Sequence, residues 1–396
     1  MLQERSNKLS RSLTSDHLEL KGLRAASSQV WGSVRLVPLI REHVREDFRI
    51  AKHLFPESTR RDVTVKGTEK KPRVVYSSYI PHGLIVSHGH NASDASVAWQ
   101  TQLGHADKKQ DMCVAPRLHK MVKRLGPGAL RMLPMHMALE GFLTLHFGGP
   151  DVAYNYYSKR SLRYGLSPRV EYGITGTTIP DLGPALAKFE IHKNQCGVLI
   201  YVGDALASAF VVGHPKDYVR LHQSVLEDLY AELFWYYGLM YRHLQTWQLD
   251  IKNTASIHDL ASLKSAYHHA LEELHTFEVM DMGRELIQRE LRKEKLYSFS
   301  NFVLERFMTD IEDTKQEINH IGERITSKQG ELMYLKTFRL SSQQVEKARL
   351  LKLLADHQWD LYLASVHGKM SAMQLKDRIV KAGFGYVLRH GANTRL

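Results

Sequence analysis

An α+β fold with an antiparallel sheet is predicted by this sequence on two observations. The first half of the chain contains short runs rich in β-branched and aromatic residues, separated by turn signals typical of antiparallel hairpins. Much of the second half has apolar residues at helical spacing. We therefore expect an N-terminal domain with an antiparallel sheet and a core helix, then a helical connector and three short C-terminal helices.

Changes in composition along the chain predict four segments. We expect a flexible arm over residues 1–18, an α+β domain over 19–245, a helical connector over 246–320, and a hairpin followed by three helices over 321–396. The chain has 396 residues, which is long enough to bury more than one core.

The charge balance favours an acidic partner. Lys and Arg outnumber Asp and Glu by 54 to 42, which gives a formal net charge of +12. The two cysteines, Cys113 and Cys196, are too few for a disulfide framework or a thiolate zinc site. No apolar run is long enough to span a membrane, and the polar leader lacks the apolar core of a secretory signal. We expect a cytoplasmic protein with no membrane partner.

The first expected strands lie before residue 100. VWGSVRLVPLI (Val30–Ile40) and RVVYSSYI (Arg73–Ile80) have strand composition, and LIVSHGHNASDASVAWQTQL predicts an antiparallel pair around a Gly and Asn turn. A basic patch follows, a segment that contains seven positive residues and one negative residue, Asp111. Its members are Lys108, Lys109, Arg117, Lys120, Lys123, Arg124 and Arg131.

The segment LPMHMALEGFLTLHF (Leu133–Phe147) predicts a buried core helix that ends at a Gly-Gly-Pro stop. His136 and Glu140 lie four residues apart on one helix face, with His146 nearby, and this spacing suits a ligand pocket or a general base. A buried His and Glu that satisfy one another explain the same pattern more simply. No CxxC or HExxH motif accompanies them, so we expect no metal and no cofactor.

The next elements are a hairpin, a long helix and a helical connector. Gly203 and Asp204 separate two apolar runs, which predicts a hairpin. A helix is expected over His214–Leu244, and opposite charges spaced i, i+4 predict further solvated helices as far as Asp313.

The end of the chain predicts a hairpin around Gln329 and Gly330, then three helices. Ser371 and Gln374 form a reciprocal capping pattern, so the third helix begins at Ala372. Leu375 and Ile379 are four residues apart and turn inward. The outer face then carries Gln374, Lys376, Arg378 and Lys381.

The segment 341–384 resembles the Fis-like helix-turn-helix found at the end of many bacterial regulators. Trp359 ends the first helix, Ser365 is the small residue within the second, and Ala382–Phe384 closes the third. The family's turn glycine would fall at Lys369, whereas this chain has Gly368, which predicts a distorted turn. Asp377 stands where such helices often carry a base. A small domain-closing bundle is the alternative interpretation.

Most of the chain also resembles the bacterial family of ARG-and-rhodanese-phosphatase-superfamily-associated proteins, second type. The motifs that carry the resemblance include VWGSVRLVPL, YIPHGLIVS, LPMHMALEGFLTLHFGGP, QCGVLIYVGDALASAFVV and HPKDY. The resemblance implies a role in bacterial conflict, defence or repair, beside ADP-ribosylglycohydrolases and phosphatases. It implies no catalytic residues.

The expected function is non-catalytic binding of nucleic acid, with duplex DNA favoured. Lys376, Arg378 and Lys381 would neutralise phosphates, and Ser371, Ala372 and Gln374 would approach base edges. We expect a homodimer, paired through the helices between Ser256 and Phe302. One alternative is a nucleotide-like ligand sensor or enzyme that uses the N-terminal domain. Another is a scaffold subunit with protein partners from the same locus.

Overall fold

The computed structural model of the chain contains two compact units. The first comprises Met1–Arg49, Ile179–Leu226 and Leu233–Arg339, and the second comprises Ile50–Thr178, Glu227–Glu232 and Leu340–Leu396. The structure describes residues 17–50, 61–65, 74–78, 83–88, 95–99, 124–126, 129–130, 143–144, 146–147, 189, 191–203, 205–224, 226, 251–252, 254–299, 301–311 and 318–390.

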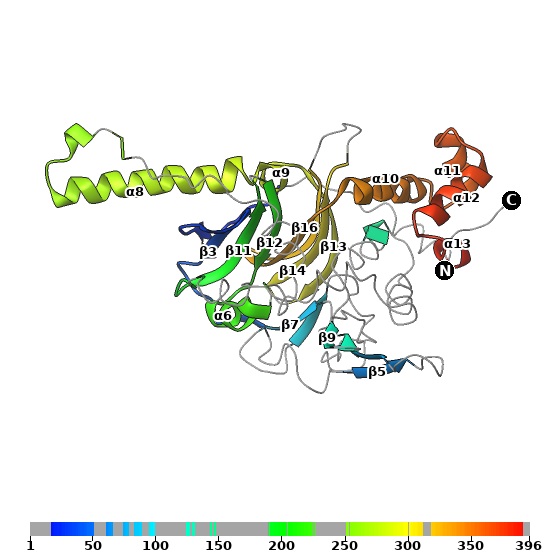
Figure 1. The fold of residues 1–396 in the computed structure, drawn as a ribbon, viewed down its shortest axis with the longest axis horizontal. Helices are drawn as coiled ribbons and strands as arrows, with labels where there is room; N and C mark the ends of the chain where they lie inside the picture. Colours follow the sequence, from blue (N-terminus) through cyan, green and yellow to red (C-terminus); the bar gives the residue numbers. More distant parts are fainter. Residues whose placement is uncertain are drawn as a thin grey trace. The chain divides into compact units, whose positions relative to one another are not determined.

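A nine-stranded antiparallel sheet forms the centre of the first unit (Figure 1). The strands are β1 (Arg24–Ala25), β2 (Gln29–Trp31), β3 (Val34–Ile40), β11 (Gln195–Val202), β12 (Ala205–Val211), β13 (Leu291–Phe299), β14 (Phe302–Thr309), β15 (His320–Ser327) and β16 (Leu332–Arg339). Their order is β1-β3-β11-β12-β16-β15-β14-β13, and β2 also pairs with β3. The α+β class and the antiparallel sheet are therefore confirmed.

The sheet carries a continuous apolar core. Every residue of β3 is buried, so neither face of this strand is exposed. On one face, Leu199 and Tyr201 of β11 belong to the same buried cluster as Met282 and Leu286, which lie in and next to the short helix α9 (Arg284–Ile287). Burial of side chains of this size stabilises a fold by roughly 1.5–3 kcal/mol each.

Two hairpins that the sequence predicts are confirmed. Strands β11 and β12 pair around Gly203, which has a φ of +61°, and β15 and β16 pair around Gly330, which has a φ of +83°. A left-handed backbone at these turns is the conformation that glycine adopts at least cost. The expected pair before residue 100 also forms, between β7 (Gly83–His88) and β8 (Ala95–Trp99).

The expectation of helices as far as Asp313 was wrong. Strands β13 and β14 occupy Leu291–Phe299 and Phe302–Thr309, and they pair with each other and with β15. Opposite charges in this segment were interpreted as i, i+4 helix pairs. In the structure they face each other across strands, as Arg306 and Glu294 do at 2.7 Å. The hairpin β15–β16 likewise belongs to the large sheet and not to the C-terminal segment.

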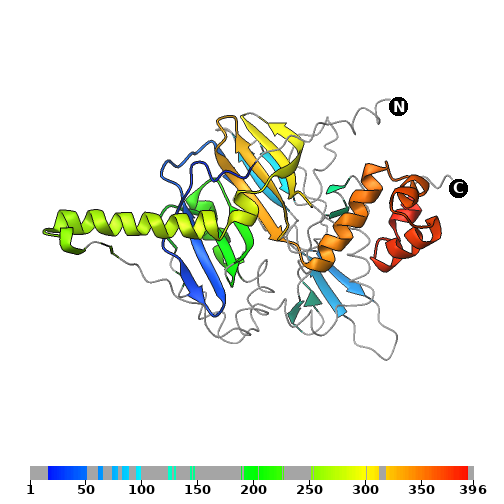
Figure 2. The same cartoon turned by 90° about the horizontal axis from the view of Figure 1, so that it is seen from above.

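The described helices of the first unit lie between β12 and β13 in the sequence. Helix α6 (Pro215–Ser224) begins directly after β12. Helix α8 (Leu260–Thr276) leads through a π-helical turn, η6 (Phe277–Asp281), towards α9. Figure 2 shows α8 projecting away from the sheet along most of its length. Asp259 caps its first turn by accepting a hydrogen bond from the Ser262 N–H at 2.7 Å.

The second unit contains short strands and the C-terminal helices. Its described strands before residue 131 are β5 (Arg61–Val65), β6 (Val74–Ser78), β7, β8, β9 (Arg124–Gly126) and β10 (Ala129–Leu130). Strand β6 confirms the strand expected over Arg73–Ile80. Of the expected core helix Leu133–Phe147, the described part is confined to its last turn, where Leu143 and Thr144 are buried.

Four helices end the chain: α10 (Ser342–Asp356), α11 (Leu361–His367), α12 (Ala372–Lys381) and α13 (Val387–His390). The start of α12 at Ala372 and its capping box are confirmed, because Ser371 and Gln374 each accept a hydrogen bond from the other's N–H. Leu375 and Ile379 are fully buried, as expected.

The turn between α11 and α12 places a left-handed residue at Lys369. Its φ is +51°, whereas the neighbouring Gly368 has a φ of −71°. The glycine therefore stands one residue before the position that needs one. A β-carbon in left-handed backbone costs roughly 1–2 kcal/mol.

Replacing Lys369 by glycine should stabilise the second unit. We expect Lys369→Gly to raise the free energy of unfolding by up to about 1 kcal/mol, because relief of the strain exceeds the added entropy of the unfolded chain. Chemical denaturation measures the change. The control is Lys369→Ala, which keeps the β-carbon and should give no gain. Equal effects of the two substitutions would mean that the turn is not strained.

Candidate functional site

The outward surface of α12 differs in two ways from the expected one. Gln374, Arg378 and Lys381 are exposed, but Lys376 is half-buried. Because a helix turns by about 100° per residue, the position after Leu375 lies at the side of the helix and not opposite the buried face. Asp377 is exposed and forms an ion pair with Lys381 at 2.7 Å, so one of the expected phosphate contacts already has a carboxylate partner.

Polar groups at the start of α12 already form hydrogen bonds with each other. The Ser371 hydroxyl accepts a hydrogen bond from the Gln374 N–H at 3.1 Å, and the Gln374 side-chain oxygen accepts one from the Ser371 N–H at 2.8 Å. The Gln374 side-chain NH₂ can still donate, and the Ser371 hydroxyl can still donate its proton. Between them lies Met373, whose side chain is 81% exposed.

The candidate pocket on the core helix lies mostly outside the described residues. This holds for His136 and Glu140, whereas His146 packs edge-on against Phe147 with ring centroids 5.1 Å apart. The second basic patch also lies outside, except for the backbone of Arg124 at the start of β9. The members outside are Lys108, Lys109, Arg117, Lys120, Lys123 and Arg131.

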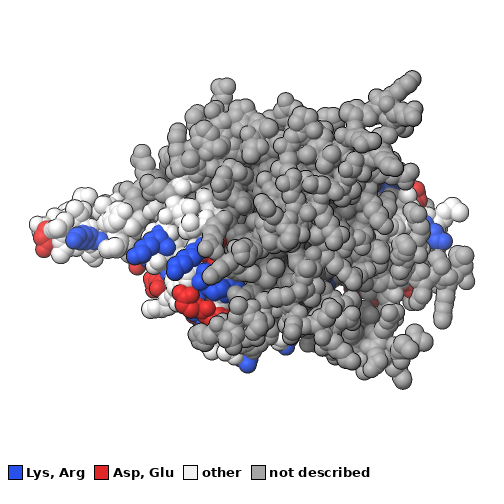
Figure 3. All heavy atoms as spheres, turned by 90° about the horizontal axis from the view of Figure 1, so that it is seen from below, with Lys and Arg blue, Asp and Glu red and all other residues white. Residues whose placement is uncertain are grey.

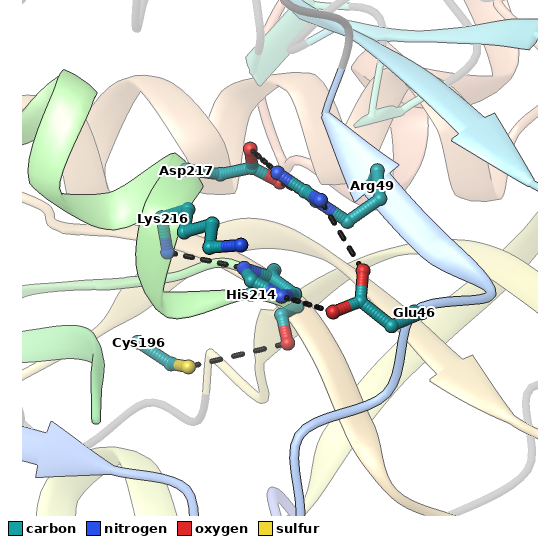
Figure 4. A network of polar contacts seen from close by, with 7 residues as sticks. Glu46, Arg49, Cys196, His214, Lys216 and Asp217 are labelled. Atoms are coloured by element: carbon teal, nitrogen blue, oxygen red, sulfur yellow. Dashed lines mark hydrogen bonds and ion pairs between the residues drawn. The ribbon is translucent and has the colours of Figure 1, made fainter.

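A polar network at the start of α6 was missed from the sequence (Figure 4). His214 immediately precedes the helix and is almost fully buried. Its Nδ1 accepts a hydrogen bond from the Lys216 N–H at 3.1 Å, so the imidazole acts as a helix cap. An acceptor at Nδ1 requires the ring proton on Nε2, which therefore donates to Glu46 at 3.1 Å.

An arginine joins the same network. Arg49 donates two hydrogen bonds to the buried Asp217, Nη2 to Oδ1 at 2.9 Å and Nε to Oδ2 at 3.1 Å. It also lies 3.3 Å from Glu46. The hydrogen bond from His214 lowers the pKa of the Glu46 carboxyl, and the hydrogen bonds to Asp217 raise the pKa of the Arg49 guanidinium. The paired fork geometry is the strongest form of an arginine–carboxylate contact.

This network links Glu46 and Arg49 to the start of α6, and its geometry is structural and not catalytic. Both ring nitrogens of His214 are engaged, so the ring has no free lone pair with which to act as a base. Cys196 is buried nearby, and burial raises the pKa of its thiol to about 11, so the reactive thiolate is not formed near neutral pH. The sequence signal was HPKDY, residues 214–218, but Glu46 and Arg49 lie about 168 residues before their partners.

A row of charged residues crosses the sheet, of which Arg306, Glu323 and Lys336 are buried and Glu294 is half-buried. In register, Glu294, Arg306, Glu323 and Lys336 lie opposite one another on β13, β14, β15 and β16. Burial raises the pKa of the Glu323 carboxyl and lowers that of the Lys336 ammonium. Alternating charges on adjacent strands favour this register, because a slip by one residue would turn the charges to the other face.

His320 is a buried histidine on β15, where it lies opposite Arg339 of β16. It is fully buried at the start of β15, and desolvation lowers its pKa to about 3. Within the described part of the chain, neither ring nitrogen has a hydrogen-bond partner. Among the described residues, no group of three His, Cys, Asp or Glu side chains could hold a metal ion.

Comparison with known proteins identifies the family. A family model described as ARPP-2 matches residues 18–300, which is more than half of the chain. The chain belongs to the ARPP-2 family. The match ends within the large sheet, so β14–β16 and the C-terminal helices of this ARPP-2 protein lie beyond it. No curated protein and no solved structure matches the chain. None of its described helices combines the length and apolarity of a membrane span.

Breaking the arginine–aspartate contact should destabilise the protein. Arg49→Met leaves Asp217 buried without its fork partner, and we expect a loss of about 2–3 kcal/mol in the free energy of unfolding. Urea denaturation measures the loss. The matched control is Arg24→Met, which removes an exposed ion pair with Glu42 and should change stability little. Similar losses for both variants would contradict a special role for Arg49.

Removing the buried imidazole should flatten the acid dependence of stability. The pKa of His320 is about 3 in the fold and roughly 6.5 in the unfolded chain, so the unfolded state binds more protons in between. Stability that is present above pH 6.5 is therefore lost as the pH falls towards 3.

His320→Phe should lose less stability than the native protein between pH 7.5 and pH 4.5. It should also be about 1–3 kcal/mol more stable at pH 4.5, because no buried polar ring is left unpaired. Guanidinium denaturation at the two pH values tests this. His269→Phe alters a histidine whose side chain is 74% exposed and serves as the control. An unchanged pH dependence in His320→Phe would show that the imidazole does not titrate as described.

Proposed function

We propose that the protein binds duplex DNA without catalysis, through a helix-turn-helix of the Fis type formed by its C-terminal helices. The observation that supports this most is the start of α12. A reciprocal cap fixes the helix at Ala372, while Leu375 and Ile379 anchor its inner side. Gln374 and Arg378 are left exposed near the first turns, where a recognition helix meets base edges and phosphates.

The charges refine how α12 would meet DNA. Arg378 and Lys381 are exposed cations, but Asp377, next to Arg378 in the sequence, pairs with Lys381. On phosphate the lysine would exchange one anionic partner for another, and the aspartate would repel the backbone. Arg378, whose guanidinium has a sulfur contact with Met370 at 4.0 Å, is therefore the principal phosphate contact that we assign.

The family resemblance supports a setting in bacterial conflict, defence or nucleic-acid repair. A scaffold role is the second candidate, and one observation favours it. Large apolar side chains are exposed on both α11 and α12, as a protein-binding surface requires. They are Tyr362 at 63%, Leu363 at 47%, Val366 at 56%, Met373 at 81% and Val380 at 56%.

Fluorescence anisotropy with labelled duplex DNA tests the proposal. We expect salt-sensitive binding by the full-length protein, with each neutralised phosphate adding about 0.9 to the logarithmic salt slope. Arg378→Glu should weaken binding by at least about tenfold and lower the slope by about 1. Lys193→Glu makes the same charge change on an exposed turn of the first unit and serves as the control.

A gain of affinity makes the test independent of misfolding. Asp377→Asn removes the repelling charge and frees Lys381, so this variant should bind DNA more tightly. Binding that persists in a chain ending at Leu340, or equal affinities for Arg378→Glu and Lys193→Glu, would overturn the proposal. If the native protein co-purifies with a protein partner and Met373→Ser/Val380→Ser does not, the scaffold role would be favoured instead.

A further inference from the structure

Helix α8, called the arm below, exposes several large apolar side chains. Leu260 is 66% exposed, Leu263 is 41% exposed and Tyr267 is 45% exposed. Within α8 only Ala270 is buried. Figure 1 shows the arm extending well beyond the sheet, and in Figure 3 its surface is mainly uncharged, with charged side chains interspersed. Exposed apolar side chains that recur on one helix face are typical of a helix that packs against another.

The root of the arm is fixed to the sheet. Arg35 of β3 forms an ion pair at 3.2 Å with Glu278 in the turn after α8, and both side chains are almost fully buried. Tyr201 of β11 donates a hydrogen bond to the Glu278 carbonyl oxygen. These contacts join three separate stretches of the chain and hold the arm in one direction. A helix held in this way presents its outer half as a fixed surface.

The two faces of the arm differ in how they are satisfied. The polar face lies against the segment 252–256, where Lys252 forms an ion pair with Glu273 at 3.0 Å. A shallow groove of about 360 Å³ runs between them and is lined by polar residues such as Ser262 and His269. The chain therefore lines part of the polar face of α8, although His269 on that face stays 74% exposed. The opposite face carries the exposed Leu260, Leu263 and Tyr267, while Leu271 and Leu274 are half-buried.

The apolar face has a spacing that is symmetric about Tyr267. Leu263 and Leu271 lie four residues before and after it, and Leu260 and Leu274 lie seven before and after. All five positions fall on one stripe of the helix, because three- and four-residue steps alternate about one helical turn. An interface between two copies related by a two-fold axis requires a self-complementary patch of this kind.

We propose that α8 pairs in antiparallel orientation with α8 of a second copy, with the two-fold axis at Tyr267. In this register Leu260 packs on the partner's Leu274, and Leu263 packs on the partner's Leu271. Lys264 flanks the stripe three residues before Tyr267, but Glu272 lies about 140° round the helix from Tyr267, so the pairing rests on the apolar stripe alone.

Sedimentation equilibrium of the full chain, without DNA, tests the dimer. We expect a monomer–dimer equilibrium that Leu263→Glu/Tyr267→Glu abolishes, because burying the new carboxylates costs more than the contact supplies. Both positions are exposed, so the monomer should keep its fold, which circular dichroism checks. Ser265→Glu adds a charge on the polar face and should leave the dimer intact. A monomer up to high micromolar concentration, or a dimer unaffected by the double substitution, would overturn the proposal.

Disulfide trapping tests the register. In a Cys113→Ser background, Tyr267→Cys should oxidise to a covalent dimer, because the two copies of residue 267 meet at the two-fold axis. A disulfide needs a separation of about 4.4–6.8 Å between the two α-carbons. Leu260→Cys should not, since its copies lie 14 residues apart along the pair, roughly 21 Å. Efficient trapping through Leu260→Cys would show a parallel pair and overturn the register.

The inference does not rest on DNA binding by α12. A dimer without DNA affinity, or DNA affinity without a dimer, separates the two proposals.

Discussion

The pairing of β12 with β16 is the contact on which the first unit depends. It joins Ser208–Val211 to Leu335–Phe338. It therefore connects β1, β2, β3, β11 and β12 with the four strands β13–β16. Side chains reinforce this seam. Ser208 donates to the Thr337 carbonyl oxygen, and the Thr337 hydroxyl accepts from the Ala209 N–H at 3.0 Å. Without this pairing each half of the sheet would expose the unpaired edge of a largely buried strand, which is a site of unwanted pairing.

Features set by near neighbours in the sequence could be predicted, and the seam could not. The hairpins at Gly203 and Gly330 and the cap at Ser371 each depend on a few consecutive residues. The β12–β16 pair joins residues about 128 apart, and no local period specifies it. Strands β13 and β14 were mistaken for helices for a related reason. Charges at i, i+4 occur both on a helix face and on strands whose partners carry the opposite sign.

The helix α12 and the polar network at α6 also show what local sequence patterns can and cannot predict. On α12, capping and apolar spacing predicted where the helix begins and which residues turn inward. The side position of Lys376 and the i, i+4 pair of Asp377 with Lys381 also follow from helical spacing, but residue type alone had assigned both lysines to phosphate. At α6 the short motif HPKDY was visible, but its meaning came from Glu46 and Arg49, which reach it only in the fold.

The arm α8 poses the question of what keeps it helical. An isolated helix of 17 residues is marginal in water, and helices usually gain most of their stability from packing. Within the described structure α8 has a capping box at Asp259, an exposed ion pair between Lys252 and Glu273, and a fixed end at Glu278. The cap contributes about 1 kcal/mol and the ion pair less. Leu260, Leu263 and Tyr267 are exposed in the described structure, whereas Leu271 and Leu274 are half-buried, so pairing through Tyr267 would add packing mainly to the outer half of α8.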